Sequence, residues 1–166
     1  IYWMQNSFKT CKGKRIMYEY NCTINRVVDG DTVDVDIDLG FGIVLTDERV
    51  RVMGIDTPES RTSDKVEKVF GKAAKARLQE LLGAKGVLKT EINKDGEDMK
   101  GKFGRVLGDF VAPDGRMCTE ILIDEGHAVP YHGQSKADIE VGHLANRQRL
   151  MQEGKVDVKL IQELSE

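Results

Sequence analysis

Residues 29–59 read DGDTVDVDIDLGFGIVLTDERVRVMGIDTPE, and most of the chain's structural and chemical information lies there. The segment DGD at 29–31 places two carboxylates around a glycine, directly before an alternating strand pattern. The segment DTPE at 56–59 places two more carboxylates at a proline-fixed bend, directly after a second strand that carries Arg51. If the two strands pair as neighbours, acidic groups from both ends converge beside an arginine.

These residue types indicate what the convergence point binds. Carboxylate oxygens without histidine or cysteine suit a hard cation such as calcium or magnesium, and not zinc. A cation beside a guanidinium group is what a phosphodiester needs, since both neutralise charge on phosphate oxygens. Each residue also has a structural interpretation: Asp29 and Asp31 alone favour a simple turn, and Arg51 alone an ordinary surface arginine.

The composition is that of one globular domain. The chain has 166 residues, of which 40% are hydrophobic and 32% charged. No apolar run approaches the roughly 18 residues of a membrane span, so we expect no membrane contact. The formal charge of −3 means that a polyanion must be held by a local cluster of cations and not by the whole surface.

The three cysteines, Cys11, Cys22 and Cys118, lack metal-site spacing, and we interpret them as reduced thiols. We therefore expect a cytoplasmic protein, or a secreted one if a signal peptide has already been removed. We also expect a monomer.

The periodicity predicts an α+β chain that is mainly β. Strands are expected at about 18–28, 32–39, 49–55, 87–92 and 103–111. Helices are expected from the N-cap Asp64 to about Leu82, where Gly83 is a natural stop, at 119–125 and at about 135–153. A further short helical piece or a frayed end is expected after them. Three strands, a helix and two strands is the order of a five-stranded OB-fold Greek-key barrel, here with about three helices. We expect an N-terminal tail at 1–17, a domain at 18–155 and a C-terminal extension at 156–166.

Two local expectations concern the segment between the acidic motifs. The strand at 32–39 places Asp34, Asp36 and Asp38 on one face, which we interpret as a solvated face and not as a second metal site, because the spacing does not fit an EF-hand. The segment 40–48 is longer than a tight hairpin, so we expect a loop that reshapes one wall of the site.

The motifs together resemble the staphylococcal nuclease (thermonuclease) family. The resemblance rests on DGDT at 29–32, Arg51 five residues before DTPE at 56–59, and KFGR at 102–105. It covers roughly residues 21–153. Each motif alone is weak, but their combination in this order is specific.

The resemblance implies a calcium-dependent phosphodiesterase that cuts DNA and RNA and leaves 3′-phosphates. The implied calcium ligands are Asp31, Asp56 and the carbonyl of Thr57, with Asp29 as a nearby outer carboxylate. The implied catalytic residues are Arg51 and Arg105, which grip the phosphate, and Glu59, which holds the attacking water as general base or as its positioner. The implied substrate contacts are Lys102 and Tyr131. We expect the cation and the arginines to keep Glu59 ionised.

The chain departs from the family pattern in two ways. It is slightly acidic, which predicts weaker or more salt-sensitive binding of its nucleic-acid partner, for which we expect a single strand to be preferred. His132 and Gly133 replace the second aromatic expected after Tyr131. The histidines are interpreted as structural or solvent-facing. The alternative function is a non-catalytic module of the same fold that binds nucleic acid or protein.

Overall fold

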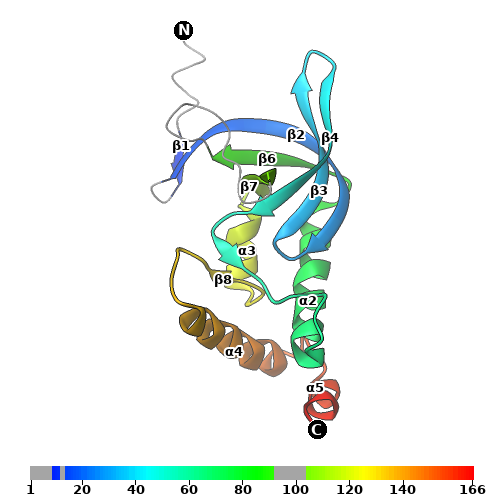
Figure 1. Ribbon diagram of the computed structural model, residues 1–166, viewed down its shortest axis with the longest axis vertical. Coiled ribbons are helices and arrows are strands. Elements are labelled where there is room, and N and C mark those ends of the chain that lie inside the picture. Colours follow the sequence, from blue (N-terminus) through cyan, green and yellow to red (C-terminus); the bar gives the residue numbers. More distant parts are fainter. Residues whose placement is uncertain (1–8, 12–13, 92–103) are drawn as a thin grey trace.

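The computed structural model describes residues 9–11, 14–91 and 104–166 (Figure 1). The strands are β1 (Lys9–Cys11), β2 (Lys14–Asp29), β3 (Thr32–Gly40), β4 (Ile43–Val52), β5 (Ile55–Asp56), β6 (Lys85–Glu91), β7 (Val106–Val111) and β8 (Val129–Pro130). The helices are α2 (Lys65–Leu82), α3 (Cys118–Asp124), α4 (Lys136–Gln152) and α5 (Val158–Ser165).

The main sheet closes on itself and forms a barrel. Its strand order is β1-β2-β3-β4-β7-β6, and an additional β2–β6 pairing joins the two sides. The closed part therefore consists of β2, β3, β4, β7 and β6, while β1 adds to β2. Only the β4–β7 pairing in this barrel is parallel. The expected α+β, mainly β, five-stranded OB-fold is confirmed.

Strand β2 closes the barrel because it is long enough to pair on both sides. Residues 16–23 pair with β6, and residues 22–29 pair with β3. Register shifts occur at Ile24/Arg26 and Val27/Asp29, where β2 pairs with β3. Such bulges bend a strand and raise its twist, as a closed barrel requires. The strand begins at Lys14, inside the range that we expected to be tail.

The β3–β4 hairpin contradicts the expected loop at 40–48. Gly40 pairs with Ile43, so only Phe41 and Gly42 lie in the turn. Both have positive φ, 56° and 75°, as a type I′ turn requires. The segment therefore forms no long loop but continues both strands, and Figure 1 shows the hairpin projecting beyond the barrel. One residue of the segment, Asp47, still lines the cavity described below.

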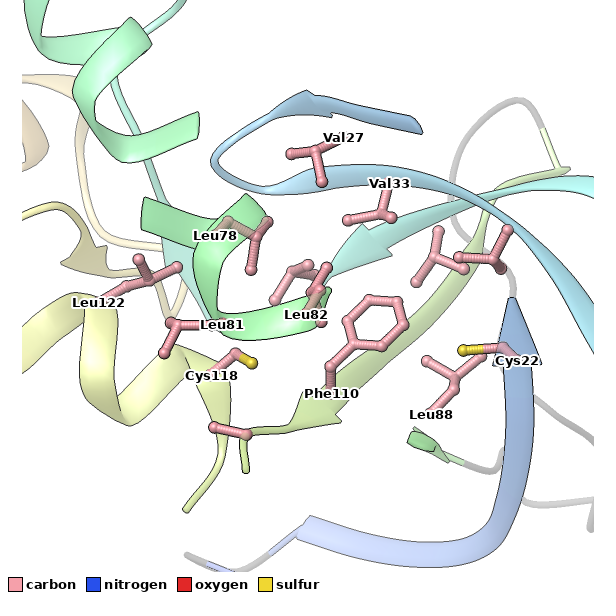
Figure 2. Close-up of a cluster of buried hydrophobic side chains, with 14 of the residues drawn as sticks. Cys22, Val27, Val33, Leu78, Leu81, Leu82, Leu88, Phe110, Cys118 and Leu122 are labelled. Atoms are coloured by element: carbon pink, nitrogen blue, oxygen red, sulfur yellow. The ribbon is translucent and has the colours of Figure 1, made fainter. Parts of the chain in front are cut away.

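The core fills the barrel and the space between it and α2. Phe110 of β7 lies among Leu88 of β6 and Leu78 and Leu82 of α2, and all four are buried (Figure 2). Alternate residues of β3 and β4 face the same core, namely Val33, Val35, Val50 and Val52. Burial raises the pKa of the Cys118 thiol to about 12, and Cys22 and Cys118 are free, as expected.

The helices have the capping residues that the sequence predicts. The Asp64 side chain accepts from the backbone N–H groups of Val66 and Glu67, and Gly83 ends α2 with φ 62°. The described residues contain four helices, one more than the three expected, because the last segment forms α5. Val156 and Ile161 pack with Phe70 and Leu150 in a second buried cluster, so the segment expected as an extension lies against α2 and α4. Among the described residues, no helix combines the length and apolar character needed to cross a bilayer.

Candidate active site

A cavity of about 660 Å³ opens on the barrel where β3 and β4 meet the loop before α2. It contains five of the predicted site residues, which come from separate parts of the chain: Asp31, Arg51, Asp56, Glu59 and Arg105. Its other charged residues are Asp29, Asp34, Asp47 and Arg49. The described lining therefore has six carboxylates and three guanidinium groups.

The remaining predicted residues lie elsewhere. Thr57 is buried beside the cavity, and its backbone N–H lies 3.4 Å from Asp31 Oδ2. Tyr131 lines a different, mostly apolar cavity of about 340 Å³ together with Met53 and Gly54. Lys102 lies outside the described residues. The structure thus brings the predicted metal and catalytic side chains together, but not Tyr131.

Strand register brings Arg51 to the acidic turn. Thr32 pairs with Arg51, and the backbone N–H of Val52 donates to the carbonyl of Asp31 at 2.8 Å. The Arg51 guanidinium forms an ion pair with Asp31 Oδ2 at 3.3 Å. It also donates to the carbonyls of Val52 and Ile55, at 2.8 and 3.1 Å. The guanidinium is therefore held in place before any substrate arrives.

Burial and neighbouring negative charges in the cavity disfavour the ionised forms of Asp31 and Glu59. Burial raises the pKa of Asp31, although Arg51 and hydrogen bonds from Thr32 and Thr57 oppose the rise, and the charge of Asp56 adds to it. Burial also raises the pKa of Glu59, and the charges of Asp29 and Asp31 raise it further. The expectation that a bound cation and the arginines keep Glu59 ionised stays a prediction, because the rise in its pKa comes from burial and from neighbouring carboxylates.

The donor set suits a hard divalent cation. The cavity has a surplus of carboxylates over guanidinium groups, and the Thr57 hydroxyl beside it is buried with no hydrogen-bond partner among the described residues. Within the part of the chain that the structure describes, no three acidic, histidine or cysteine side chains already form a ligand cluster. Asp31 pairs with Arg51 through its Oδ2 atom, and Asp56 pairs with His143 through its Oδ2 atom. The residues fit a cation in charge and donor type.

Gly71 in α2 determines how closely the loop that carries Glu59 approaches the helix. A Cβ atom at Gly71 would lie 2.3 Å from the carbonyl oxygen of Glu59 and 2.6 Å from the backbone nitrogen of Ser60. Ser60 in turn donates its backbone N–H to Asp29 Oδ1 at 3.2 Å. The loop is therefore packed against α2 and tied to the acidic turn. The sequence did not lead us to predict a role for Gly71. The one sequence signal for it is that a glycine lies on the apolar face of the predicted helix.

Asp34 corrects the solvated-face interpretation of β3. It is only 6% exposed and accepts two hydrogen bonds from Arg49, at 2.8 and 3.0 Å, and one from Arg26 at 3.0 Å. The bond from Arg49 is the main reason that its pKa is lowered. The prediction failed for Asp34 because strand alternation shows which face a side chain occupies, but not whether other side chains cover that face.

His143 of α4 also contacts the site, which the sequence did not predict. Its Nε2 atom lies 2.6 Å from Oδ2 of Asp56, 87 residues away in the chain. The spacing of the histidines gave no signal for this contact, because it depends on how α4 packs against the rest of the protein.

The closed barrel and its charged cavity define an OB-fold protein with a polar site on the barrel surface. The family model described as "Staphylococcal nuclease homologue" matches residues 49–157, and the chain belongs to this family.

Three curated relatives each match about two thirds of the chain. The chain is 38% identical over 106 residues to the SPbeta prophage-derived endonuclease YokF of Bacillus subtilis, covering 64% of this chain and 32% of that protein. It is 35% identical over 108 residues to endonuclease YncB of the same species, covering 65% of this chain and 46% of that protein. It is 36% identical over 105 residues to the thermonuclease of Staphylococcus intermedius, covering 63% of this chain and 56% of that protein. The chain thus spans between about a third and just over half of these relatives.

Proposed function

We propose that this chain is a calcium-dependent nuclease that hydrolyses phosphodiester bonds of DNA, RNA or both by metal-assisted attack of water and leaves 3′-phosphate ends. The observation that carries the proposal is the meeting of Asp31, Arg51, Asp56, Glu59 and Arg105 in one cavity. Relatives that match about two thirds of the chain carry the names endonuclease and thermonuclease, which supports the same reaction class.

The charge balance of the cavity gives the reason for a metal requirement. Six carboxylates and three guanidinium groups leave an excess of negative charge, which repels a phosphodiester. Asp31, Asp56 and the Thr57 carbonyl would hold Ca²⁺. When bound there, the ion would supply positive charge that polarises the phosphate and favours ionised carboxylates.

The side chains of this chain perform the remaining tasks. Arg51 is already oriented by two backbone carbonyls and Asp31, so it meets the phosphate without reorganisation. Arg105 lies immediately before β7 and lines the same cavity. Arginine suits this role because its planar fork contacts two phosphate oxygens at once. Glu59 holds the attacking water, as base or as positioner.

We propose a single strand as the preferred substrate of a monomeric enzyme. OB-fold barrels present a curved face along which an unpaired strand can run. Lys102 and Tyr131 are the proposed contacts to the rest of the nucleotide. Tyr131 lines a separate cavity, so its proposed contact would be to a part of the nucleotide other than the reacting phosphate.

An assay with matched substrates tests the activity. Single-stranded DNA, duplex plasmid and RNA are each incubated with the protein in calcium, and again after addition of a chelator. Degradation only in calcium, fastest for the single strand, is the expected result. Nucleic acid that is bound but uncut under both conditions would instead support the alternative, a non-catalytic binding module.

Substitution of the two proposed catalytic side chains tests their roles. Glu59→Gln and Arg105→Ala should each retain the fold and lose at least about a hundredfold in turnover, because each removes a group placed for the transition state. Turnover is measured under single-turnover conditions, and folding by circular dichroism. Glu140→Gln and Arg116→Ala, at exposed positions outside the cavity, are the matched controls. Near-normal turnover in either test variant would remove that residue from the mechanism.

A further inference from the structure

We propose that His143 is a positioning residue that orients the carboxylate of Asp56 for cation binding. The inference rests on the proposed function, and it adds a residue of α4 to a site otherwise built from the barrel and the loop before α2.

The contact between the two side chains defines the direction of the hydrogen bond. His143 Nε2 lies 2.6 Å from Asp56 Oδ2. A carboxylate can only accept, so Nε2 carries the proton and donates it. The His143 side chain is 13% exposed, and its Nδ1 atom is buried without a hydrogen-bond partner among the described residues. The polar end of the imidazole is therefore directed at Asp56.

The packing of α4 brings the histidine to this place. A Cβ atom at Gly142 would lie 3.0 Å from Val129 Cγ1, so the glycine allows α4 to approach β8 closely. Val129 is also the strand partner of Asp56. Asn146 of the next helical turn donates to the carbonyl of Ala128 at 3.2 Å. These contacts fix α4 beside β8, and His143, next to Gly142, then reaches across to Asp56.

Asp56 needs such support because its own backbone element is short. Strand β5 has two residues and pairs only with the two residues of β8. The Asp56 side chain is 35% exposed, so burial restricts its rotation less than that of a core side chain. The hydrogen bond from His143 of α4, the helix that packs against β8, restricts the rotation of the Asp56 side chain further. Hydrogen-bonded partners of metal ligands typically contribute about 10–100-fold in affinity or activity.

A competing interpretation makes the opposite prediction. If the hydrogen bond from His143 competed with the cation for the Asp56 carboxylate, removal of the histidine would strengthen cation binding. If the histidine only stabilised the packing of α4, its removal would lower the stability of the protein and leave the calcium affinity of the folded protein unchanged.

Three variants distinguish these cases: His143→Ala, His143→Gln, and Val141→Ala as the control at an exposed position of the same helix. Calcium dissociation constants are measured by titration calorimetry on the full chain, together with unfolding free energies and turnover at saturating calcium. We expect His143→Ala to bind calcium about tenfold more weakly. We expect His143→Gln, whose Nε2 can donate from a similar position, to recover much of this loss, and Val141→Ala to match the wild type.

The results separate failure of this inference from failure of the proposed function. An unchanged or tighter dissociation constant in His143→Ala, with a functional wild type, overturns the positioning role alone. A loss in His143→Ala that glutamine does not restore also overturns it, because the hydrogen bond is then not the cause. A wild type that neither binds calcium nor cuts nucleic acid refutes the proposed function, and the inference with it.

Discussion

At the scale of single residues, Gly71 shows how a helix residue sets the position of the loop that carries Glu59. Alanine is the better helix former by about 1 kcal/mol, so propensity alone would favour its presence here. A Cβ atom at this position would instead overlap the backbone of Glu59 and Ser60. The close approach of the loop at Glu59 and Ser60, and not helix propensity, therefore explains the glycine at position 71.

We predict that Gly71→Ala lowers turnover by at least about tenfold, because a displacement of about 1 Å in a catalytic group is enough for such a loss. Single-turnover cleavage measures the effect. Lys72→Ala, an exposed position on the same helical turn, should cleave like the wild type. Normal cleavage by Gly71→Ala would show that the Glu59 loop can shift without consequence.

Asp34 yields a prediction about pH. Its pKa is lowered in the folded protein by hydrogen bonds from Arg49 and Arg26. It therefore stabilises the fold above its unfolded pKa of about 3.9, and this stabilisation is lost as the pH falls through the lower folded value. We predict that Asp34→Asn lowers the free energy of unfolding by about 1 kcal/mol at pH 7, a modest loss because both arginines are half exposed.

Urea denaturation at pH 7 and at about pH 3 measures this difference, with Asp124→Asn, an exposed position, as the control. The difference in unfolding free energy between the wild type and Asp34→Asn should be smaller at the lower pH. If this difference were the same at both pH values, the shape of the side chain at position 34, and not its charge, would explain the lost stability.

At the scale of elements, the sequence predicted best where one local signal is sufficient. The N-cap Asp64 and Gly83 defined α2, and the alternation of β3 defined its buried face. The beginning of β4 was missed because Ile43, Val44 and Leu45 are consecutive apolar residues without alternation, and all are exposed in the hairpin. A pattern that relies on one buried face cannot detect a strand pair that extends into solvent.

The hairpin turn gives a prediction of increased stability. Phe41 has φ 56° and is 103% exposed, so it adopts a conformation unfavourable for its side chain and buries nothing. Asparagine is preferred at the first turn position of a type I′ hairpin. We predict that Phe41→Asn raises the unfolding free energy by about 0.5–1 kcal/mol, measured by thermal and urea denaturation. The matched change Gly42→Ala, at φ 75°, should lower it. Destabilisation by Phe41→Asn would contradict the strain argument.

At the scale of the whole molecule, the barrel was predictable but several contacts between distant elements were not. The order of strands and helices was sufficient to predict the OB-fold, since few topologies fit it. The contacts of Arg77 with Glu125, and of His143 with Asp56, join residues 48 and 87 positions apart, and neither pair has a local sequence pattern. Resemblance predicted the motif residues of the cavity, whereas Gly71, Asp34 and His143 required the packed structure.

Calcium titration calorimetry on the wild type and on Asp56→Asn is the most direct test of whether acidic and arginine side chains meet around one divalent ion. Asp38→Asn, on the exposed hairpin, is the control. We predict one calcium site in the wild type, at least about tenfold weaker binding in Asp56→Asn, and no change in Asp38→Asn. Absence of calcium binding by the wild type, or equal affinity in Asp56→Asn, would contradict the assignment of this cavity as the metal site.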